Sequence, residues 1–441
     1  MTAGLPVSRT LAAGLVLLGA LVASGPARAE APVETLAEAW TVALQQDRAL
    51  AATRSQAEAA GFDAQAARAQ RWPTVSVAGS YTQLDDSPAF DFSFTGLPLT
   101  PPELFQDDSY VSATAAVTVP LFTSGRISSS IAAAEARERG AGAHVAAATA
   151  DLKLAVADAY IGVLRARKAH AVASSNVQTL AGLVHDTSSM FERELVPKNE
   201  LLAAEVALAD ARQNELRAAN AAAVAQAQYN RRLGAPLDRA IELSELIDVA
   251  VEAEQELPAL IAQAQTRRTE LTALDAQAEA LGQLARTERS RVLPQVGLSG
   301  GYQYLENQFL DDETVGMAGI GVQWAMFDGG QSRKRAAALD RNRRATEQQR
   351  ADAASQIELQ VRQAWLGIGE ARQRVEVNAR AAEQAEENLR IARERYTAGL
   401  GTQTQLLGAE TLRVQALMNR DEAKLDASLA QMRLARAVGA L

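Results

Sequence analysis

The side chains that most often carry catalysis or bind metals are scarce in this sequence and poorly spaced. Cysteine is absent, which excludes disulfides, thiolate catalysis, cysteine metal sites and a lipid anchor on an N-terminal cysteine. The three histidines, His144, His170 and His185, lie 26 and 15 positions apart. Because a helical metal site needs an i, i+4 pair of histidines, we interpret all three as solvated helix residues.

Two further clusters resemble ligand sites, but each has a simpler interpretation. The acidic run Asp311 to Glu313 is of a type that collects divalent cations, yet such runs are more often solvated loop. A group of glycines lacks the lysine of a phosphate-binding loop and fits strands at a crowded wall. These are Gly297, Gly300, Gly301, Gly319 and Gly321. The sequence therefore predicts no enzyme, cofactor or metal site; an exported enzyme is the alternative that a convergent polar pocket would support.

The chain contains an internal duplication that must position any functional residue. The pairs that match 205 positions apart are Leu152 and Ile357, Val156 and Val361, Tyr160 and Trp365, Val172 and Val377, Leu201 and Leu406, and Glu205 and Glu410. Upstream, Pro73 and Pro294 match at an offset of 221, because the first copy has a loop that is 16 residues longer. The sequence thus predicts one architecture built twice.

Residues 1–29 have the pattern of a signal peptide. Arg9 supplies the positive charge, Leu11 to Ala23 form an apolar run too short for a membrane helix, and Ala27 to Ala29 form the cleavage signal. Removal of the leader changes the formal charge from −9 to −11, and an acidic chain argues against nucleic acid as a partner. The mature chain is expected to be exported and to have no helical membrane span.

Two long proline-free stretches, Arg126 to Leu195 and Gln331 to Tyr396, have apolar residues at helical spacing. Each predicts a single helix roughly 100 Å long. A helix before each strand pair is expected from about Val33 to Arg71 and from about Leu257 to Arg291. The first predicted repeat covers 30–232, with a hairpin at 73–122 and helices at 126–195 and 199–232. A segment at 233–256 joins it to the second repeat at 257–441. The second repeat has a hairpin at 294–327 and helices at 331–396 and 402–438.

Each expected hairpin has two runs of about 10 residues in which apolar and polar residues alternate, which is the signature of a transmembrane β-strand. No Lys or Arg occurs from Trp72 to Gly125 or from Val292 to Ser332, in a chain that has 44 of them. The acids in these windows lie mainly in the loops: Asp85, Asp86, Asp91, Glu103, Asp107, Asp108, Glu306, Asp311, Asp312 and Glu313. Two soluble hairpins with one wet face are the alternative, but charge-free strands with charged tips favour a membrane location.

Four strands are too few to close a barrel, and open sheet edges are not tolerated in lipid. Closure needs at least about 8 strands, so the chain is expected to complete a ring with copies of itself. The predicted fold class is an α+β membrane protein with an internal duplication. Three copies of four strands each would form a homotrimeric 12-stranded β-barrel, continuous with a long α-helical coiled-coil tunnel.

The two expected helix turns carry the most specific resemblance to known proteins. The segments Leu195 to Glu205 and Tyr396 to Glu410, with Phe-x-x-Gly steps at Phe122 and Phe327, resemble the TolC-type outer-membrane efflux protein family. The resemblance covers essentially the whole mature chain and depends on the order and duplication of its elements. It implies a trimeric duct in the outer membrane of a Gram-negative bacterium, in contact with outer-membrane lipid and with a large periplasmic portion. Such a duct opens when a periplasmic adaptor protein and an inner-membrane efflux pump or secretion transporter engage it.

The resemblance also implies that the two turns form the periplasmic end, restrict the resting pore and contact the adaptor. The residues assigned to this tip are Leu195, Asn199, Glu200, Gly399, Leu400, Gly401, Thr402, Gln405 and Gly408. Gln405 and Gly408 occupy positions at which the family has acids, whereas Glu200 keeps an acid. A periplasmic coiled-coil tether without a pore is the alternative, and it predicts extraction without detergent. Drugs, metal ions and polypeptides all suit a duct of this shape, because selection lies mostly in the pump.

Overall fold

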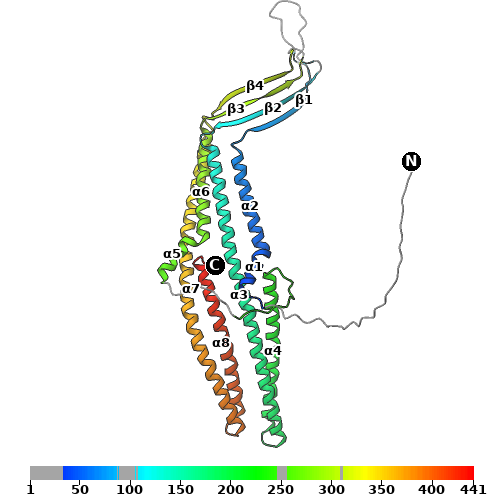
Figure 1. Ribbon diagram of the computed structural model, residues 1–441, viewed down its shortest axis with the longest axis vertical. Helices are drawn as coiled ribbons and strands as arrows, with labels where there is room; N and C mark the ends of the chain where they lie inside the picture. Colours follow the sequence, from blue (N-terminus) through cyan, green and yellow to red (C-terminus); the bar gives the residue numbers. More distant parts are fainter. Residues whose placement is uncertain (1–32, 87, 89–104, 106–107, 246–255, 308–310) are drawn as a thin grey trace, which may run out of the picture.

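The computed structural model describes residues 33–86, 88, 105, 108–245, 256–307 and 311–441. Figure 1 shows an elongated molecule with a four-stranded sheet at one end, long helices along its length and two helix turns at the other end. The expected leader at 1–29, part of the joining segment, and the loop acids Asp91, Glu103 and Asp107 lie outside the described residues.

Two helices of 67 residues, α3 (Arg126–Glu192) and α7 (Gln331–Thr397), run through most of the molecule. Each follows a glycine in the left-handed region, Gly125 with φ 84° and Gly330 with φ 82°, a conformation that residues with a Cβ rarely adopt. Helices of 35 residues come after the turns: α4 (Lys198–Arg232) and α8 (Gln403–Ala437). Because α3 packs on α4 and α7 packs on α8, each turn folds the chain back into an antiparallel helix pair.

The segment before each hairpin consists of two helices, where the sequence predicted one over 33–71 and one over 257–291. The four helices are α1 (Leu36–Gln46), α2 (Arg48–Ala69), α5 (Leu257–Arg267) and α6 (Thr269–Arg289). The breaks fall at Asp47 and Arg268, which have extended backbone with ψ 120° and 114°. Asp47 caps α2, because its carboxylate accepts a hydrogen bond from Leu50 N at 2.7 Å.

The break at Arg268 is fixed by a polar cluster at the end of α8. The buried Arg268 guanidinium donates to the carbonyl oxygens of Arg436 and Ala437 at 3.4 and 3.2 Å. It also donates to both carboxylate oxygens of Glu270 at 3.0 Å. Arg436 donates to Glu270 at 2.6 Å and to Asp151 at 2.7 Å. Arg268 thus donates to the Ala437 carbonyl oxygen at the C-terminus of α8 and is a second donor to the Arg436 carbonyl oxygen, which Gly439 N also reaches at 3.2 Å.

The charge on Glu270 is expected to make the stability of this junction depend on pH. Burial raises the pKa of Glu270, but hydrogen bonds from Arg268 and Arg436 outweigh burial and lower the pKa from 4.5 to about 2. The stability contributed by a lowered pKa is complete above pH 4.5 and is lost as the pH falls toward 2. Unfolding followed by circular dichroism across this range should show a loss of at most about 3 kcal/mol. Glu270→Gln should flatten the profile; an unchanged profile in this variant would contradict the assignment.

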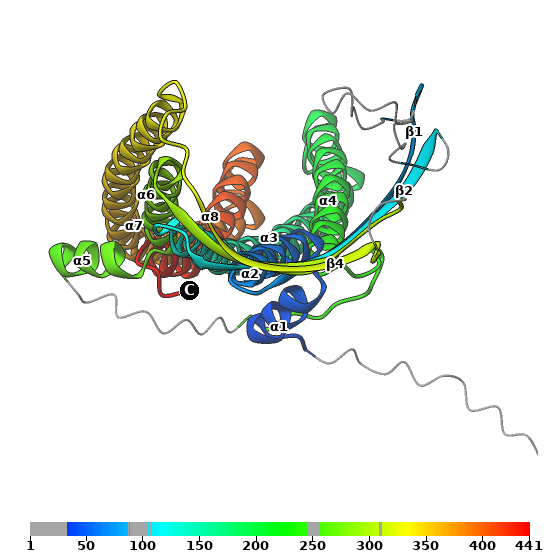
Figure 2. The same ribbon diagram turned by 90° about the horizontal axis from the view of Figure 1, so that it is seen from above.

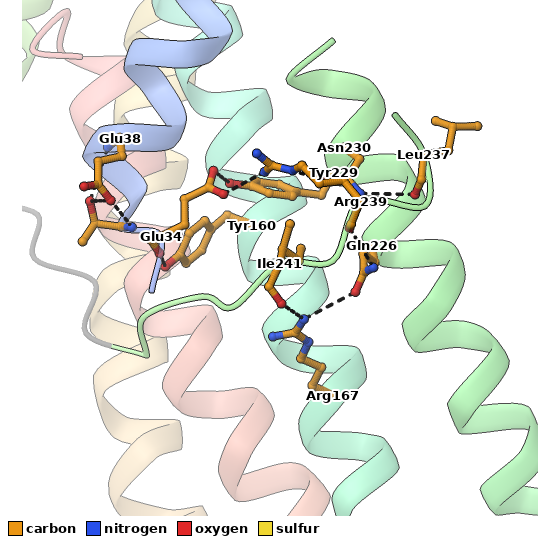
Figure 3. Close-up of polar contacts among 11 residues, drawn as sticks. Glu34, Glu38, Tyr160, Arg167, Gln226, Tyr229, Asn230, Leu237, Arg239 and Ile241 are labelled. Carbon is orange, nitrogen blue, oxygen red and sulfur yellow. Dashed lines mark hydrogen bonds and ion pairs between the residues drawn. The ribbon is translucent and has the colours of Figure 1, made fainter. Parts of the chain in front are cut away.

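A second polar cluster holds the N-terminal segment to the middle of the helices (Figure 3). Glu34 accepts a hydrogen bond from the Tyr229 hydroxyl at 2.6 Å and pairs with Arg239 at 2.7 Å. The Tyr160 hydroxyl lies 2.8 Å from the carbonyl oxygens of both Glu34 and Ser244. Burial raises the pKa of Tyr160 to about 12, so this hydroxyl stays protonated and donates. The cluster therefore ties two chain segments across α3 and α4.

Removal of the Tyr160 hydroxyl should destabilise the helical body. Tyr160→Phe keeps the buried ring but removes the single hydroxyl proton shared by these carbonyl oxygens, of which Glu34 O still accepts from Ser244 N at 3.0 Å, so the loss is about 1 kcal/mol. The midpoint of denaturant unfolding, followed by circular dichroism, should fall accordingly. Tyr81→Phe is the matched control, because within the described residues the Tyr81 hydroxyl donates to the exposed Gln83 side chain at 3.0 Å. Equal midpoints for the two variants would show that the buried hydroxyl contributes nothing.

The four strands form one antiparallel sheet in chain order. They are β1 (Thr74–Gln83), β2 (Ser109–Phe122), β3 (Gln295–Leu305) and β4 (Thr314–Gln323). The first hairpin joins the second through β2 and β3, for example with Val117 opposite Gly300. Within the described residues, the outer edges of β1 and β4 have no neighbouring strand. Seen from above, the sheet and helices follow a curved arc and not a closed ring (Figure 2).

The strand register separates an apolar face of the sheet from a polar one. The apolar face carries Val75, Val77, Tyr81, Val111, Val117, Val119, Val296, Leu298, Tyr302, Tyr304, Ile320 and Val322. The polar face carries Ser76, Ser80, Thr82, Ser112, Thr114, Thr118, Ser299, Gly301, Gln303, Gly319 and Gly321, and its large apolar members are Tyr110, Leu305, Val315 and Met317. On the apolar face, Val77 is 80% exposed and Ile320 is 71% exposed. An exposed apolar surface of this extent needs lipid or protein against it.

Candidate functional site

The two helix turns at the far end of the molecule have the same backbone geometry. Their hydrogen bonds run from Glu194 N to Phe191 O and Leu195 N to Met190 O, and from Gly399 N to Tyr396 O and Leu400 N to Arg395 O, at 2.8 to 3.0 Å. Both sets form a Schellman cap at the C-terminus of the long helix. The left-handed position is Glu194 (φ 61°) in the first turn and Gly399 (φ 71°) in the second. The 205-residue offset therefore extends through the turns. Glu194 has a left-handed backbone conformation that glycine adopts more easily.

The helices that follow the turns begin differently. Thr402 and Gln405 form a capping box at the start of α8, in which each side chain accepts from the other's backbone N–H at 3.3 Å. The helix that follows the first turn, α4, begins after Pro197, and its N-terminus has no side-chain cap. The Gln405 side chain is thus engaged at its own helix end. In the sequence, the spacing of Thr402 and Gln405 is the feature that indicates this capping box.

Side chains at the second turn reach the first. Gln403 Nε2 donates to the carbonyl oxygen of Glu200 at 2.8 Å. The Tyr396 hydroxyl lies 3.4 Å from Glu200 Oε2 and 3.5 Å from Thr187 Oγ1. Gln403, Tyr396 and Thr187 are buried, and burial together with the nearby Glu200 raises the pKa of Tyr396. These contacts tie the α3–α4 pair to the α7–α8 pair at the tip.

An apolar cluster and a buried ion pair support these contacts. The cluster draws on all four helices: Leu180, Leu183, Ala204, Leu208, Ala211, Leu389, Tyr396, Leu406 and Ala409. Glu410 is 3% exposed and pairs with Arg413 at 2.7 Å. Arg413 also lies 3.5 Å from Ser175 Oγ of α3. The ion pair lies within α8, and removal of one partner would leave an uncompensated buried charge next to α3.

A pocket of about 330 Å³ lies beside the tip, between α3, α7 and α8. Its charged lining consists of Asp186, Arg193, Arg393 and Glu410. Leucines, Met190 and the Tyr396 ring form its apolar wall, and Thr179, Ser189 and Thr397 also line it. The pocket therefore offers an apolar floor with charges of both signs around it.

The structure places every tip residue predicted from the sequence at or next to the two turns. Leu195 and Leu400 are 69% and 74% exposed. Asn199, Gly399, Thr402, Gln405 and Gly408 are exposed, and Glu200 and Gly401 are half-buried. Of these residues, Glu200 accepts hydrogen bonds from side chains of the other turn in the part of the chain that the structure describes. Sequence reasoning missed Gln403 and Thr187, because their partners lie more than two hundred positions away in the chain.

In the part of the chain that the structure describes, no three His, Cys, Asp or Glu side chains are grouped as metal ligands would be. His144, His170 and His185 lie along α3, in separate turns of that helix. Over the same residues, no helix has both the length and the apolar character needed to cross a bilayer.

Comparison with protein families identifies the chain. The model of the outer membrane efflux protein family matches residues 40–235 and 260–440, which span both repeats. The chain belongs to the outer membrane efflux protein family. No curated protein sequence matches it significantly. The family match confirms the resemblance that the turns and the duplication indicated.

Solved structures of outer membrane proteins and channels have a similar fold. The outer membrane protein VceC of Vibrio cholerae is 20% identical, with a TM-score of 0.79 over 92% of this chain and 96% of that one. The outer membrane channel CmeC of Campylobacter jejuni is 12% identical, with a TM-score of 0.78 over 92% and 85%. The open MtrE channel of Neisseria gonorrhoeae is 16% identical, with a TM-score of 0.70 over 92% and 88%. These likenesses confirm the predicted fold, in which a four-stranded sheet continues into long helix pairs.

Proposed function

We propose that three copies of this chain form an outer-membrane exit duct of an efflux or type I secretion system. The observation that carries the proposal is the sheet, which has no lysine or arginine, one apolar face and one polar face. Such a sheet fits a barrel wall between lipid and water. Twelve strands from three copies would close it, and the helix pairs would continue the wall as a tunnel through the periplasm.

The tip provides a closable end for this duct. Contacts from Gln403 and Tyr396 to Glu200 hold two helix pairs together in each copy. We expect these contacts to restrict the pore at rest and to break when the helix pairs splay apart. The protein itself needs no catalytic group, because an energised partner drives the substrate and the duct supplies a passage.

The same end suits a periplasmic adaptor protein. Leu195 and Leu400 present exposed apolar side chains within the two turns. The adjacent pocket combines apolar and charged walls, which is the surface that an amphipathic helical partner fits. The adaptor would link the duct to an inner-membrane pump or secretion transporter.

A periplasmic tether without a pore is the rival function. It would require the apolar face of the sheet to be covered by protein, whereas Val77, Ile320 and their neighbours on that face are exposed in the chain. The two functions also differ in extraction, since a tether would leave the membrane fraction without detergent. The exposed apolar face favours the duct.

Conductance measurements on the purified protein in planar lipid bilayers test the proposal. The wild-type protein should give discrete steps of current. Gln405→Asp adds one carboxylate per copy at the tip and should increase the preference for cations, since a ring of acids attracts them. Glu200→Lys should shift the preference toward anions. Absence of current steps from folded protein would contradict the duct, and unchanged selectivity in both variants would contradict the position of the tip.

A further inference from the structure

A pocket lies at the border between the sheet and the helices of the second repeat. Its volume is about 460 Å³. Arg289 lines it from the end of α6, Phe327 from the segment between β4 and α7, and Arg333 from the first turn of α7. The pocket is thus at the sheet end of the long helices, away from the two turns (Figure 1). None of the residues assigned to the tip lines it.

The apolar wall of this pocket continues the apolar face of the sheet. Ile320 lies on that face, and the alternation extends through Trp324 to Met326 after β4 has ended. Met326 lines the pocket and is 72% exposed, and Phe327 beside it is 87% exposed. Trp324 Nε1 donates to the carbonyl oxygen of Val292 at 3.1 Å, which fixes the indole at the end of the sheet. Exposed aromatic side chains at the end of membrane strands are typical of the level of the lipid headgroups.

The pocket also contains a cation that no acid of the described chain neutralises. Its other arginine, Arg289, pairs with Asp340. Asp328 caps α7, because its carboxylate accepts hydrogen bonds from two backbone N–H groups at 2.8 and 2.9 Å. Arg333 is exposed and has no ion-pair partner among the described residues. It is the first basic residue after the window 292–332, so its charge stands where the sheet gives way to the helices.

The first repeat has a similar apolar residue but not this charge. The 205-residue offset carries Phe327 to Phe122, which is 57% exposed. The same offset carries the run 333–335, Arg-Lys-Arg, to the run 128–130, Ser-Ser-Ser. The Ser128 hydroxyl donates to a backbone carbonyl of its own helix start at 3.0 Å. A ligand that needs both an apolar wall and a free cation is therefore expected at the second repeat.

We propose that this pocket binds one phospholipid from the membrane leaflet on the side of the helices. The lipid phosphate accepts hydrogen bonds from the Arg333 guanidinium, whose planar fork suits phosphate oxygens. An acyl chain lies over Met326 and Phe327. The occupant is a lipid because the wall beside the arginine is apolar and continues the face that the proposed duct places in the bilayer. This inference rests on that proposed function and adds to it a lipid site made by one arginine and one apolar wall.

Native mass spectrometry of delipidated protein in detergent tests the site with three probes. They are dioleoyl phosphatidylglycerol, dioleoylglycerol, which has the same chains without phosphate, and glycerol 3-phosphate, which has the phosphate without chains. The wild-type protein should bind phosphatidylglycerol about tenfold more tightly than either other probe, since each lacks one half of the interaction. Equally tight binding of glycerol 3-phosphate would overturn the lipid in favour of a free anion. Equally tight binding of dioleoylglycerol would overturn the role of the phosphate.

Three variants locate the phosphate. Arg333→Ser should weaken the binding of phosphatidylglycerol by about tenfold, because it removes a charge-assisted hydrogen bond. Arg335→Ser is the matched control, since it removes the same charge from the same helix at a residue that does not line the pocket. Ser128→Arg should add a second tight site to each chain beside Phe122. Equal weakening by Arg333→Ser and Arg335→Ser would overturn the pocket in favour of a diffuse basic surface. A Ser128→Arg protein without the added site would overturn the claim that one arginine and one wall make it.

The outcomes separate this inference from the function on which it rests, because lipid binding is counted on folded protein whether or not it conducts. Wild-type protein that conducts but binds all three probes alike would overturn the lipid site and leave the duct standing. Wild-type protein that binds phosphatidylglycerol through Arg333 but gives no current steps would overturn the duct alone.

Discussion

An arginine on the apolar face of the sheet is expected to prevent assembly in the outer membrane, whereas an arginine on the next residue is tolerated. Val117 lies near the middle of β2, is 40% exposed and faces the same side as Val75 and Gly300. Thr118 faces the polar side, next to Thr74 and Ser299. A lipid-facing arginine at the bilayer midplane costs about 2–4 kcal/mol, and every copy in the assembly would carry it.

The pair Val117→Arg and Thr118→Arg is a matched comparison, because both change one residue of the same inner strand to the same side chain. Outer membranes from cells that express each variant would be analysed for the amount of assembled, heat-resistant protein. Val117→Arg should lose most of it, and Thr118→Arg should retain it. Equal loss in both variants would contradict the division of the sheet into a lipid face and a water face.

Release of the tip contacts is expected to open the duct. Tyr396→Phe with Gln403→Ala removes the side-chain contacts that the second turn makes to Glu200. At about 1–2 kcal/mol for each copy, three copies would lose about 3–6 kcal/mol of preference for the closed tip. A shift of about 5.5 kcal/mol is enough to convert a two-state equilibrium from 1:99 to 99:1. The mean conductance in planar bilayers should therefore rise severalfold.

Gln415→Ala is the control for this release. Gln415 is an exposed residue of the same helix, and its amide bonds Asn419 one turn along at 2.8 Å. The control should have wild-type conductance. If the double variant conducts like the wild type and the control, the tip contacts do not restrict the pore, although the barrel and its copies could still assemble as proposed.

The sequence predicted those features of the fold that depend on local pattern. Absence of proline and helical spacing of apolar residues located α3 and α7, and strand alternation located the hairpins. The break at Arg268 could not be predicted, because it depends on carbonyl oxygens of Arg436 and Ala437 far along the chain. The pairing of β2 with β3 could not be predicted from local pattern either, because it joins strands from different repeats. The break at Asp47 did have a local signal, since aspartate is a common N-cap.

The candidate site was predictable to a similar extent. The repeat located both turns, because the geometry of a turn is set by residues that are neighbours in sequence. The resemblance then assigned residues of these turns to the tip. The contact of Gln403 with Glu200 was not predictable, since its repeat counterpart Lys198 makes no such bond and a single glutamine carries no signal. Gln405, which the resemblance assigned to the tip, has a second role that the structure adds: its side chain completes the cap of α8.

The number of copies in the detergent-extracted particle is the most direct test of the account. One chain supplies four strands with two open edges, a sheet that is not stable alone in lipid. Native mass spectrometry of protein extracted from outer membranes should therefore detect three copies of the chain. A stable single copy that stays in solution without detergent would contradict the account.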